Sequence, residues 1–183
     1  PGITVRIKMN HSLGPNTRLI GIEGGQAKLS TPVLTLNLAS AERNIQAMMN
    51  HCQSTNQTLR PHGKSHKCSA IAQRQIDAGA AGICCATIRE AEIMVDNGIS
   101  GVLITSPVTT KAKISRLIAL DQRAKNLMAV VDNALTVTAI KAGCDQAGNR
   151  KPLALLVDFD IGLHRTGTKI HFSILFVRHI KSI

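Results

Sequence analysis

The sequence predicts an α/β fold built on a parallel sheet, and two regularities support this prediction. Between residues 33 and 160, apolar runs of strand length alternate with segments of helical periodicity, with a repeat of about 22–27 residues. The apolar runs are nearly continuous, as expected for strands that are covered on both faces. These patterns indicate either a doubly wound sheet or a barrel.

The first half of the chain supplies three of the predicted strands and two of the helices. Thr31-Pro32 precedes the first strand, and Ser40 can cap the helix that follows it. Apolar side chains then recur at helical spacing up to Cys52. The second helix starts at a Ser65 or Ser69 cap and ends at Gly79. The strands are predicted at 33–38, 58–62 and 82–87.

The second half continues the same alternation. Asn97-Gly98 ends a helix that begins at Ile88, because glycine readily adopts the left-handed conformation of a C-terminal cap. Further helices are predicted over 110–123 and 134–142. The remaining strands are predicted at 101–105, 127–132 and 153–160.

Polar side chains follow the predicted strands at their carboxyl ends, where barrels and open parallel sheets form their sites. These residues are His62, Lys64, Thr87, Thr105, Ser106, Asp132, Asn133, Asp158 and Asp160.

Composition excludes several classes of protein. With 183 residues and 44% hydrophobic content, the chain can build one globular core. The net charge of +11 comes mainly from the two ends: residues 23–160 hold 15 of the 22 basic side chains against all 11 acidic ones. Nucleic-acid binding is disfavoured by this balance and by the scarcity of aromatic side chains on which bases could stack.

Cysteine usage and hydropathy indicate the environment of the protein. Five cysteines at irregular spacing do not suggest a disulfide framework, and Cys84-Cys85 in an apolar run indicates buried free thiols. We therefore expect a reducing, cytoplasmic location. No apolar run approaches the ~20 residues of a membrane span, and no signal peptide is evident. The chain starts at Pro1, so the true start of the protein is expected to lie upstream.

The segment Arg60–Cys68 concentrates reactive side chains. On a strand, His62, Lys64 and His66 would share one face. Desolvation and nearby cations lower the pKa of an ammonium group, so Lys64 is a candidate amine nucleophile. The alternative interpretation is a solvated basic loop. A metal site formed by His62, His66 and Cys68 is disfavoured.

The two ends of the chain depart from the alternating pattern. Residues 1–28 form a partly irregular leader, in which the glycine-rich 21–25 segment is interpreted as a turn rather than a phosphate loop. Residues 161–167 form a compact loop in which His164 and Arg165 could face an anion. Residues 169–183 are an atypical tail, for which we hypothesise a shifted reading frame or a truncation; the coding sequence tests this.

Five motifs in order carry a resemblance to a known family: Ser30–Leu34, Glu42–Ile45, Leu59–Cys68, Gly82–Thr87 and Gly162–Gly167. Together they resemble the D-threonine aldolase and D-serine dehydratase-like family, pyridoxal-phosphate (PLP) enzymes of the alanine racemase type. The resemblance runs from about Thr17 to Thr168. It implies a partial (β/α)8 TIM barrel over 29–168, with about five of eight barrel strands, an N-terminal strand and helix, and no C-terminal β domain.

The resemblance also implies roles for individual residues. Lys64 would form the internal aldimine with pyridoxal 5′-phosphate and later act as a base. Arg165 would hydrogen-bond the phenolic oxygen of the cofactor, for which a planar guanidinium is suited. His62 and His66 are candidates for tuning Lys64, or are structural histidines. The family's divalent metal is expected to be held by C-terminal residues outside this chain, so no metal ligand is assigned.

The implied activity is that of a PLP-dependent lyase. Aldol cleavage of D-3-hydroxy amino acids to glycine and an aldehyde is the first expectation, with the small-molecule D-amino acid as the partner. The alternatives are dehydration of D-serine or D-3-hydroxyaspartate, and an inactive fragment of such an enzyme. The resemblance is compatible with a homodimer of the full-length protein, and it implies neither a nucleic-acid nor a membrane partner.

Overall fold

The computed structural model describes residues 14–148 and 152–169, and the chain divides into two compact units, Pro1–Glu42 and Arg43–Ile183. In the first unit, two 3₁₀ helices follow one another, η1 (Gly14–Leu19) and η2 (Gly25–Lys28). The Asn16 side chain closes this segment: its amide donates to Ser30 O at 3.1 Å and its oxygen accepts from Ser30 N–H at 2.8 Å. The glycine-rich 21–25 segment forms turns, as predicted.

The second unit is organised on a four-stranded sheet with the order β1-β2-β3-β4. The strands are β1 (Ile83–Cys85), β2 (Val102–Ile104), β3 (Met128–Val131) and β4 (Ala154–Val157). Each neighbouring pair is parallel, with Cys84 opposite Leu103, Leu103 opposite Met128, and Met128 opposite Ala154. The carboxyl ends of all four strands therefore lie at one edge of the sheet.

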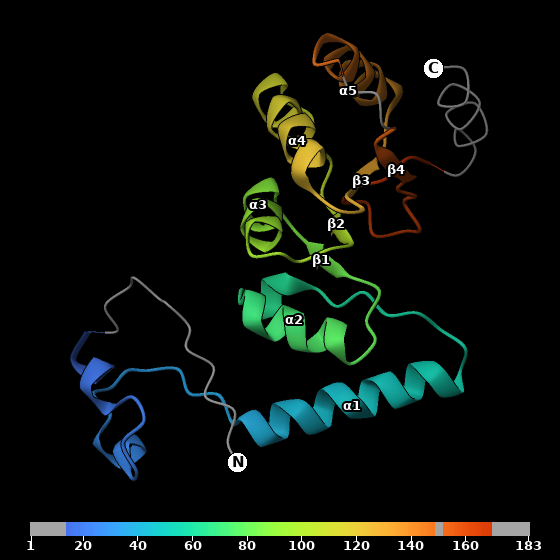
Figure 1. Cartoon of the computed structure of the whole chain (residues 1–183). Coiled ribbons are helices and arrows are strands. Elements are labelled where there is room, and N and C mark those ends of the chain that lie inside the picture. The colour runs from blue at the N-terminus through green and yellow to red at the C-terminus, as the bar shows by residue number, and fades with distance from the viewer. Residues whose placement is uncertain (1–13, 149–151, 170–183) are drawn as a thin grey trace. The chain divides into compact units, whose positions relative to one another are not determined.

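Five α-helices occur in the described residues: α1 (Leu38–Ser54), α2 (Ser69–Asp77), α3 (Ile88–Asp96), α4 (Lys111–Arg123) and α5 (Ala134–Gln146). Three of them begin with a side-chain cap, because the oxygens of Thr87, Thr110 and Asn133 each accept from a backbone N–H in the first turn. Helices α3, α4 and α5 lie side by side along one face of the sheet (Figure 1). None of the helices described here has the length and apolar character needed to cross a membrane.

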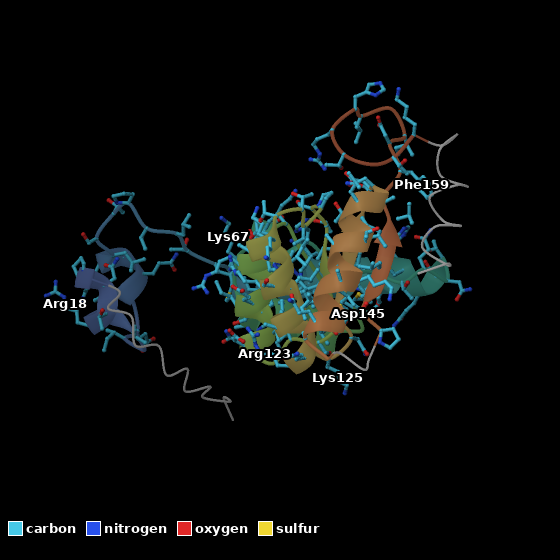
Figure 2. The ribbon with its side chains drawn as sticks, turned by 90° about the horizontal axis from the view of Figure 1, so that it is seen from above. Arg18, Lys67, Arg123, Lys125, Asp145 and Phe159 are labelled. Carbon is cyan, nitrogen blue, oxygen red and sulfur yellow. The ribbon has the colours of Figure 1, made fainter. Side chains whose placement is uncertain are left out.

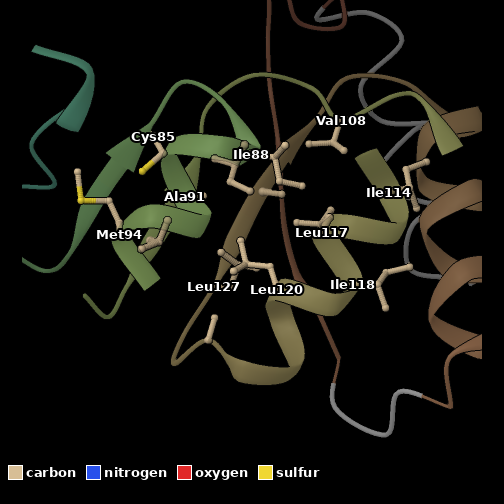
Figure 3. Packing of buried hydrophobic residues seen from close by; sticks show 14 of the residues in the cluster. Cys85, Ile88, Ala91, Met94, Val108, Ile114, Leu117, Ile118, Leu120 and Leu127 are labelled. Atoms are coloured by element: carbon tan, nitrogen blue, oxygen red, sulfur yellow. The ribbon is translucent and has the colours of Figure 1, made fainter. Parts of the chain in front are cut away.

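The core lies between the sheet and these helices (Figure 3). Alternate strand residues point into it, and their exposed fractions are 0–1%. From the helices, Ala91, Leu117 and Leu120 meet them with no exposed surface. The buried strand residues are Ile83, Cys85, Val102, Ile104, Ala129 and Val131.

The opposite face of the sheet is less covered. Cys84, Leu103, Met128 and Val130 are only partly buried there, and Leu156 on β4 is 39% exposed. Because the predicted strands are apolar on both faces, this open face is where they would meet the interior of a barrel.

The helices and the four strands after residue 80 confirm the sequence predictions, but the predicted caps of the first two helices are wrong. Asn37 Oδ1 accepts from Ser40 N–H at 2.9 Å, so Ser40 lies within α1, and α2 follows Cys68 without a side-chain cap.

Two predicted strands are also wrong. Residues 33–37 are not a strand: Leu34 is fully exposed, and no described strand pairs with this segment. The predicted strand over 58–62 is reduced to a single bridge between His62 and Cys84. Pro61 lies within this segment and has no N–H to donate, which limits a regular ladder there.

Candidate functional site

Lys64 lies on a tight turn at the carboxyl edge of the sheet. The 3₁₀ helix η3 (Gly63–Ser65) follows His62, whose bridge to Cys84 aligns it beside β1. Gly63 is buried, and a Cβ there would lie 3.2 Å from Met94 Cε and 3.4 Å from Cys84 O. Glycine thus lets the turn pack against β1 and α3 while Lys64 itself stays exposed.

This turn corrects the expectation that His62, Lys64 and His66 share one face of a strand. Backbone bonds reverse the chain after His62: Ser65 N–H donates to His62 O at 3.3 Å, and Lys67 N–H donates to Gly63 O at 2.7 Å. Side-chain alternation therefore ends at His62. Only His62 and Lys64 of the three stay in direct hydrogen-bonded contact.

His62 connects the Lys64 turn to β2. Lys64 N–H donates to His62 Nδ1 at 3.3 Å, and His62 Nε2 lies 3.2 Å from Thr105 Oγ1. Thr105 Oγ1 in turn donates to Cys85 O at 3.1 Å. Burial lowers the pKa of His62, Lys64 lowers it further, and Glu90 opposes both effects. The ring is therefore neutral at pH 7.

His66 points to a different environment. Its Nδ1 accepts from Cys68 N–H at 3.1 Å, just before α2 begins. Its Nε2 and the Oε1 of Gln75 on α2 are both buried without a partner in hydrogen-bonding geometry. Burial lowers the pKa of His66, with Gln75 opposing the effect. These contacts support the structural alternative for His66 over a role beside Lys64.

The cysteines at β1 are poor nucleophiles. Burial raises the pKa of the Cys85 thiol to about 12, with Glu90 and Cys84 adding to the effect. Burial also raises the pKa of Cys84, against an opposing effect of Arg60. Both thiols stay protonated at neutral pH, so neither is a candidate nucleophile at this edge.

Arg165 lies in the loop that follows β4. Asp160 organises this loop: its Oδ1 accepts from Gly162 N–H at 2.9 Å and from His164 N–H at 3.0 Å, and its Oδ2 lies 2.9 Å from His164 Nδ1. These bonds lower the pKa of Asp160, the two backbone donors first. Thr168 closes the loop by pairing with Asp158 and Asp160. Arg165 is exposed.

Lys64 and Arg165 both lie where the strands end, at the carboxyl edge of the sheet. Lys64 lies beside β1, the first strand in the sheet order, whereas Arg165 follows β4, the last. Figure 2 shows Lys67, just after the Lys64 turn, on the other side of this unit from Phe159, where the Arg165 loop begins. Among the described residues, no hydrogen bond or ion pair joins either side chain to another group. The sequence predicted Thr105 at this edge, but it predicted neither the contact of Thr105 with His62 nor the effect of Glu90 on the pKa of His62. The position of Thr105 at the end of a strand was the one available signal.

Comparison with known proteins decides the family. The model of the alanine racemase N-terminal domain matches residues 36–182. The chain belongs to this family. Its four-stranded parallel sheet with flanking helices is a partial alanine racemase-type barrel. Alanine racemase from Clostridium difficile shares the fold at 13% identity and a TM-score of 0.59, over 76% of this chain and 37% of that chain.

More similar members of the alanine racemase-like group are lyases. D-threonine aldolase from an Arthrobacter species is 39% identical over 77% of this chain, and 3-hydroxy-D-aspartate aldolase from Paracoccus denitrificans is 32% identical over 78%. The structure of D-threonine aldolase from Filomicrobium marinum matches with a TM-score of 0.74 and 41% identity, over 78% of this chain and 38% of that chain. The chain spans 36% of the length of the Arthrobacter and Paracoccus relatives.

Proposed function

We propose that Lys64 is the cofactor lysine of a pyridoxal-phosphate-dependent lyase that cleaves D-3-hydroxy amino acids. The relatives support a pyridoxal-phosphate-dependent lyase family, and the aldolases among them are named for D-threonine and 3-hydroxy-D-aspartate. The observation that carries the assignment to this chain is the Lys64 turn. It presents an exposed amine, without a hydrogen bond or ion pair among the described residues, at the carboxyl edge of the sheet.

The chemistry of the residues present fits such a cofactor, but one cofactor could contact both Lys64 and Arg165 only with the two ends of the sheet brought together, as closure into a barrel would do. An uncommitted amine can condense with an aldehyde, and Arg165 offers a guanidinium that is likewise uncommitted within the described residues. When bound, pyridoxal phosphate supplies the electron sink for a carbanion at the substrate's α carbon. Lys64 would hold the cofactor through Nζ and, once displaced by the substrate amine, would accept a proton there. Arg165 would hold the phenolic oxygen.

Aldol cleavage is the activity that we propose first. It would convert a D-3-hydroxy amino acid to glycine and an aldehyde. The D-threonine aldolase relative is 39% identical to this chain, whereas the D-threo-3-hydroxyaspartate dehydratase of a Delftia species is 29% identical. Dehydration is the second candidate, because the structure of that dehydratase matches with a TM-score of 0.72.

Covalent labelling tests the proposal. The purified chain is titrated with pyridoxal phosphate, reduced with borohydride, and digested for mass spectrometry. We expect the label on Lys64, and we expect Lys64→Arg to lose it while keeping the positive charge. Lys67→Ala is the matched control, because it removes a neighbouring exposed lysine from the same segment. Assays with D-threonine and D-3-hydroxyaspartate then distinguish glycine release from ammonia release.

Label spread over many lysines, or unchanged in Lys64→Arg, would contradict the assignment of the cofactor lysine. Label on Lys64 with neither product would identify the chain as a cofactor-binding fragment without the proposed activity.

A further inference from the structure

The hydrogen bonds of His62 fix the position of its proton. Lys64 N–H, at 3.3 Å, can only donate, so His62 Nδ1 must be an acceptor. A neutral ring then carries its proton on Nε2. Cys85 O, at 3.1 Å from Thr105 Oγ1, can only accept, so the Thr105 hydroxyl donates to it. The Thr105 oxygen is left to accept the proton of His62 Nε2, at 3.2 Å. One direction of donation therefore satisfies all three contacts.

This arrangement opposes protonation of the ring. A second proton would go to Nδ1 and would face Lys64 N–H, so the bond to the turn would be lost. The charged groups around the ring are Lys64 on the turn itself and Glu90 on α3, and their effects oppose each other; burial adds to the effect of Lys64. Both geometry and surroundings keep His62 neutral at pH 7.

We propose that Thr105 and His62 form a positioning pair that holds the Lys64 turn in the geometry from which its amine reacts; the link to a cofactor rests on the function proposed above. Thr105, on the segment after β2, fixes the ring of His62. The ring fixes the N–H of Lys64, the second residue of the turn. Neither side chain needs to touch the cofactor for this role.

The choice of residue types supports the pair. The backbone N–H groups that begin a helix lack partners within it, and Ser, Thr, Asp or Asn commonly accepts from one of them. His62 takes that place at η3. A shorter cap could accept from Lys64 N–H, but only a longer side chain with a second polar atom can also reach Thr105, 43 positions away in the sequence. Histidine meets both requirements.

Two readouts test the pair, and the first needs no cofactor. Nitrogen-15 NMR of the cofactor-free chain should show His62 protonated on Nε2 and unprotonated on Nδ1. Amide hydrogen exchange should show Lys64 N–H exchanging about threefold to tenfold faster in Thr105→Val, the loss expected for one hydrogen bond of about 1 kcal/mol. Valine preserves the shape of threonine and removes only the hydroxyl function.

The second readout is the pyridoxal-phosphate concentration that half-labels Lys64. We expect Thr105→Val to raise it about threefold to tenfold, and Thr105→Ser, which keeps the hydroxyl, to restore it to within about twofold. His62→Asn retains an acceptor for Lys64 N–H but not the reach to Thr105, so it should resemble Thr105→Val. Thr110→Val is the matched control: it removes a hydroxyl that accepts from Lys113 N–H at the start of α4 and makes no hydrogen bond to His62, so it should change neither readout.

Several results would overturn the pair. These are a proton on Nδ1 of His62, unchanged exchange of Lys64 N–H in Thr105→Val, and equal labelling in Thr105→Val and the parent chain. If the parent chain shows the expected tautomer and exchange but takes up no cofactor, the proposed function fails while the positioning of the turn is supported.

Discussion

The two ends of the sheet hold the two predicted cofactor contacts, and they are built differently. At the Lys64 end, β1 is in the core, with Ile83 and Cys85 fully buried. At the Arg165 end, β4 alternates between exposed and partly buried positions, and Leu156 is 39% exposed. The loop after β4 is held by its own bonds to Asp160, whereas the Lys64 turn is held by β1, β2 and α3.

We infer from this difference that the Lys64 turn is rigid and that the Arg165 loop can adjust its position. A covalent contact to a cofactor needs a fixed amine, and the packed end of the sheet supplies it. A hydrogen bond from an arginine tolerates more movement, because its long side chain can adjust. Function at the first end should therefore depend on global stability, and function at the second on local loop order. Substitutions at matched positions of the two ends test this view.

The largest effect is expected from the glycines that begin and end these segments. A Cβ on Gly82, just before β1, would collide with the backbone of Gly101, and Gly82 has φ of +146°. We expect Gly82→Ala to lower the free energy of unfolding by about 3–5 kcal/mol, because backbone on both strands must move. Urea denaturation followed by circular dichroism measures this loss.

Gly167→Ala is the matched substitution at the other end. Gly167 has φ of +100°, and a Cβ there would collide with Asp160 N. We expect the Arg165 loop to open while the core stays folded, so the urea midpoint should change much less than in Gly82→Ala. Equal losses of stability in the two variants would contradict the proposed division between the ends.

Side-chain truncation should give the next largest effect. Leu117 on α4 has no exposed surface, so Leu117→Ala should cost about 2–5 kcal/mol. Leu156→Ala on the open face of β4 should cost less than about 1 kcal/mol, because little apolar area returns to water. Thermal and urea denaturation of both variants measures the contrast. A large loss in Leu156→Ala would show that something in the full chain covers this face.

Local signals predicted the helices well. Ile114, Leu117 and Ile118 at helical spacing are typical of the helix predicted over 110–123, and the helix spans Lys111–Arg123. The strand over 58–62 was predicted from its place in the alternation of strands and helices, and it was wrong because Pro61 limits the ladder there. Cap chemistry and periodicity are local, whereas strand formation depends on a partner strand.

The site was only partly predictable for the same reason. Lys64 was identified from its own segment and from the resemblance, and its assignment as the cofactor lysine stays a prediction. The contact of His62 with Thr105 joins residues 43 positions apart. The bridge of His62 to Cys84 and the parallel register of β1 and β2 together bring them close. The separation of His66 from Lys64 likewise follows from the η3 turn, which a strand interpretation could not foresee.

The smallest effect that we expect is a pH dependence of stability. The two ends of the sheet should lose stability in different pH ranges. Burial lowers the folded-state pKa values of His62 and His66 below 6.5. Just below pH 6.5 the unfolded chain therefore binds more protons than the folded chain does. Their contribution to stability is complete above pH 6.5 and is lost as the pH falls through the lower folded-state values. Backbone donors lower the pKa of Asp160 below 3.8, so the Arg165 loop should lose its contribution only in more acidic solution.

Urea denaturation at intervals between pH 7.5 and 3 measures the global effect, and amide exchange of Gly162 and His164 follows the loop. The double variant His62→Asn/His66→Asn keeps acceptors near the Nδ1 positions but cannot titrate, so we expect the loss of stability just below pH 6.5 to shrink in it. Asp160→Asn should remove the acid-dependent change in loop exchange. If the double histidine variant altered the exchange of Gly162 and His164, the loop and the Lys64 turn would be coupled, and the two ends of the sheet would have to be treated as one site.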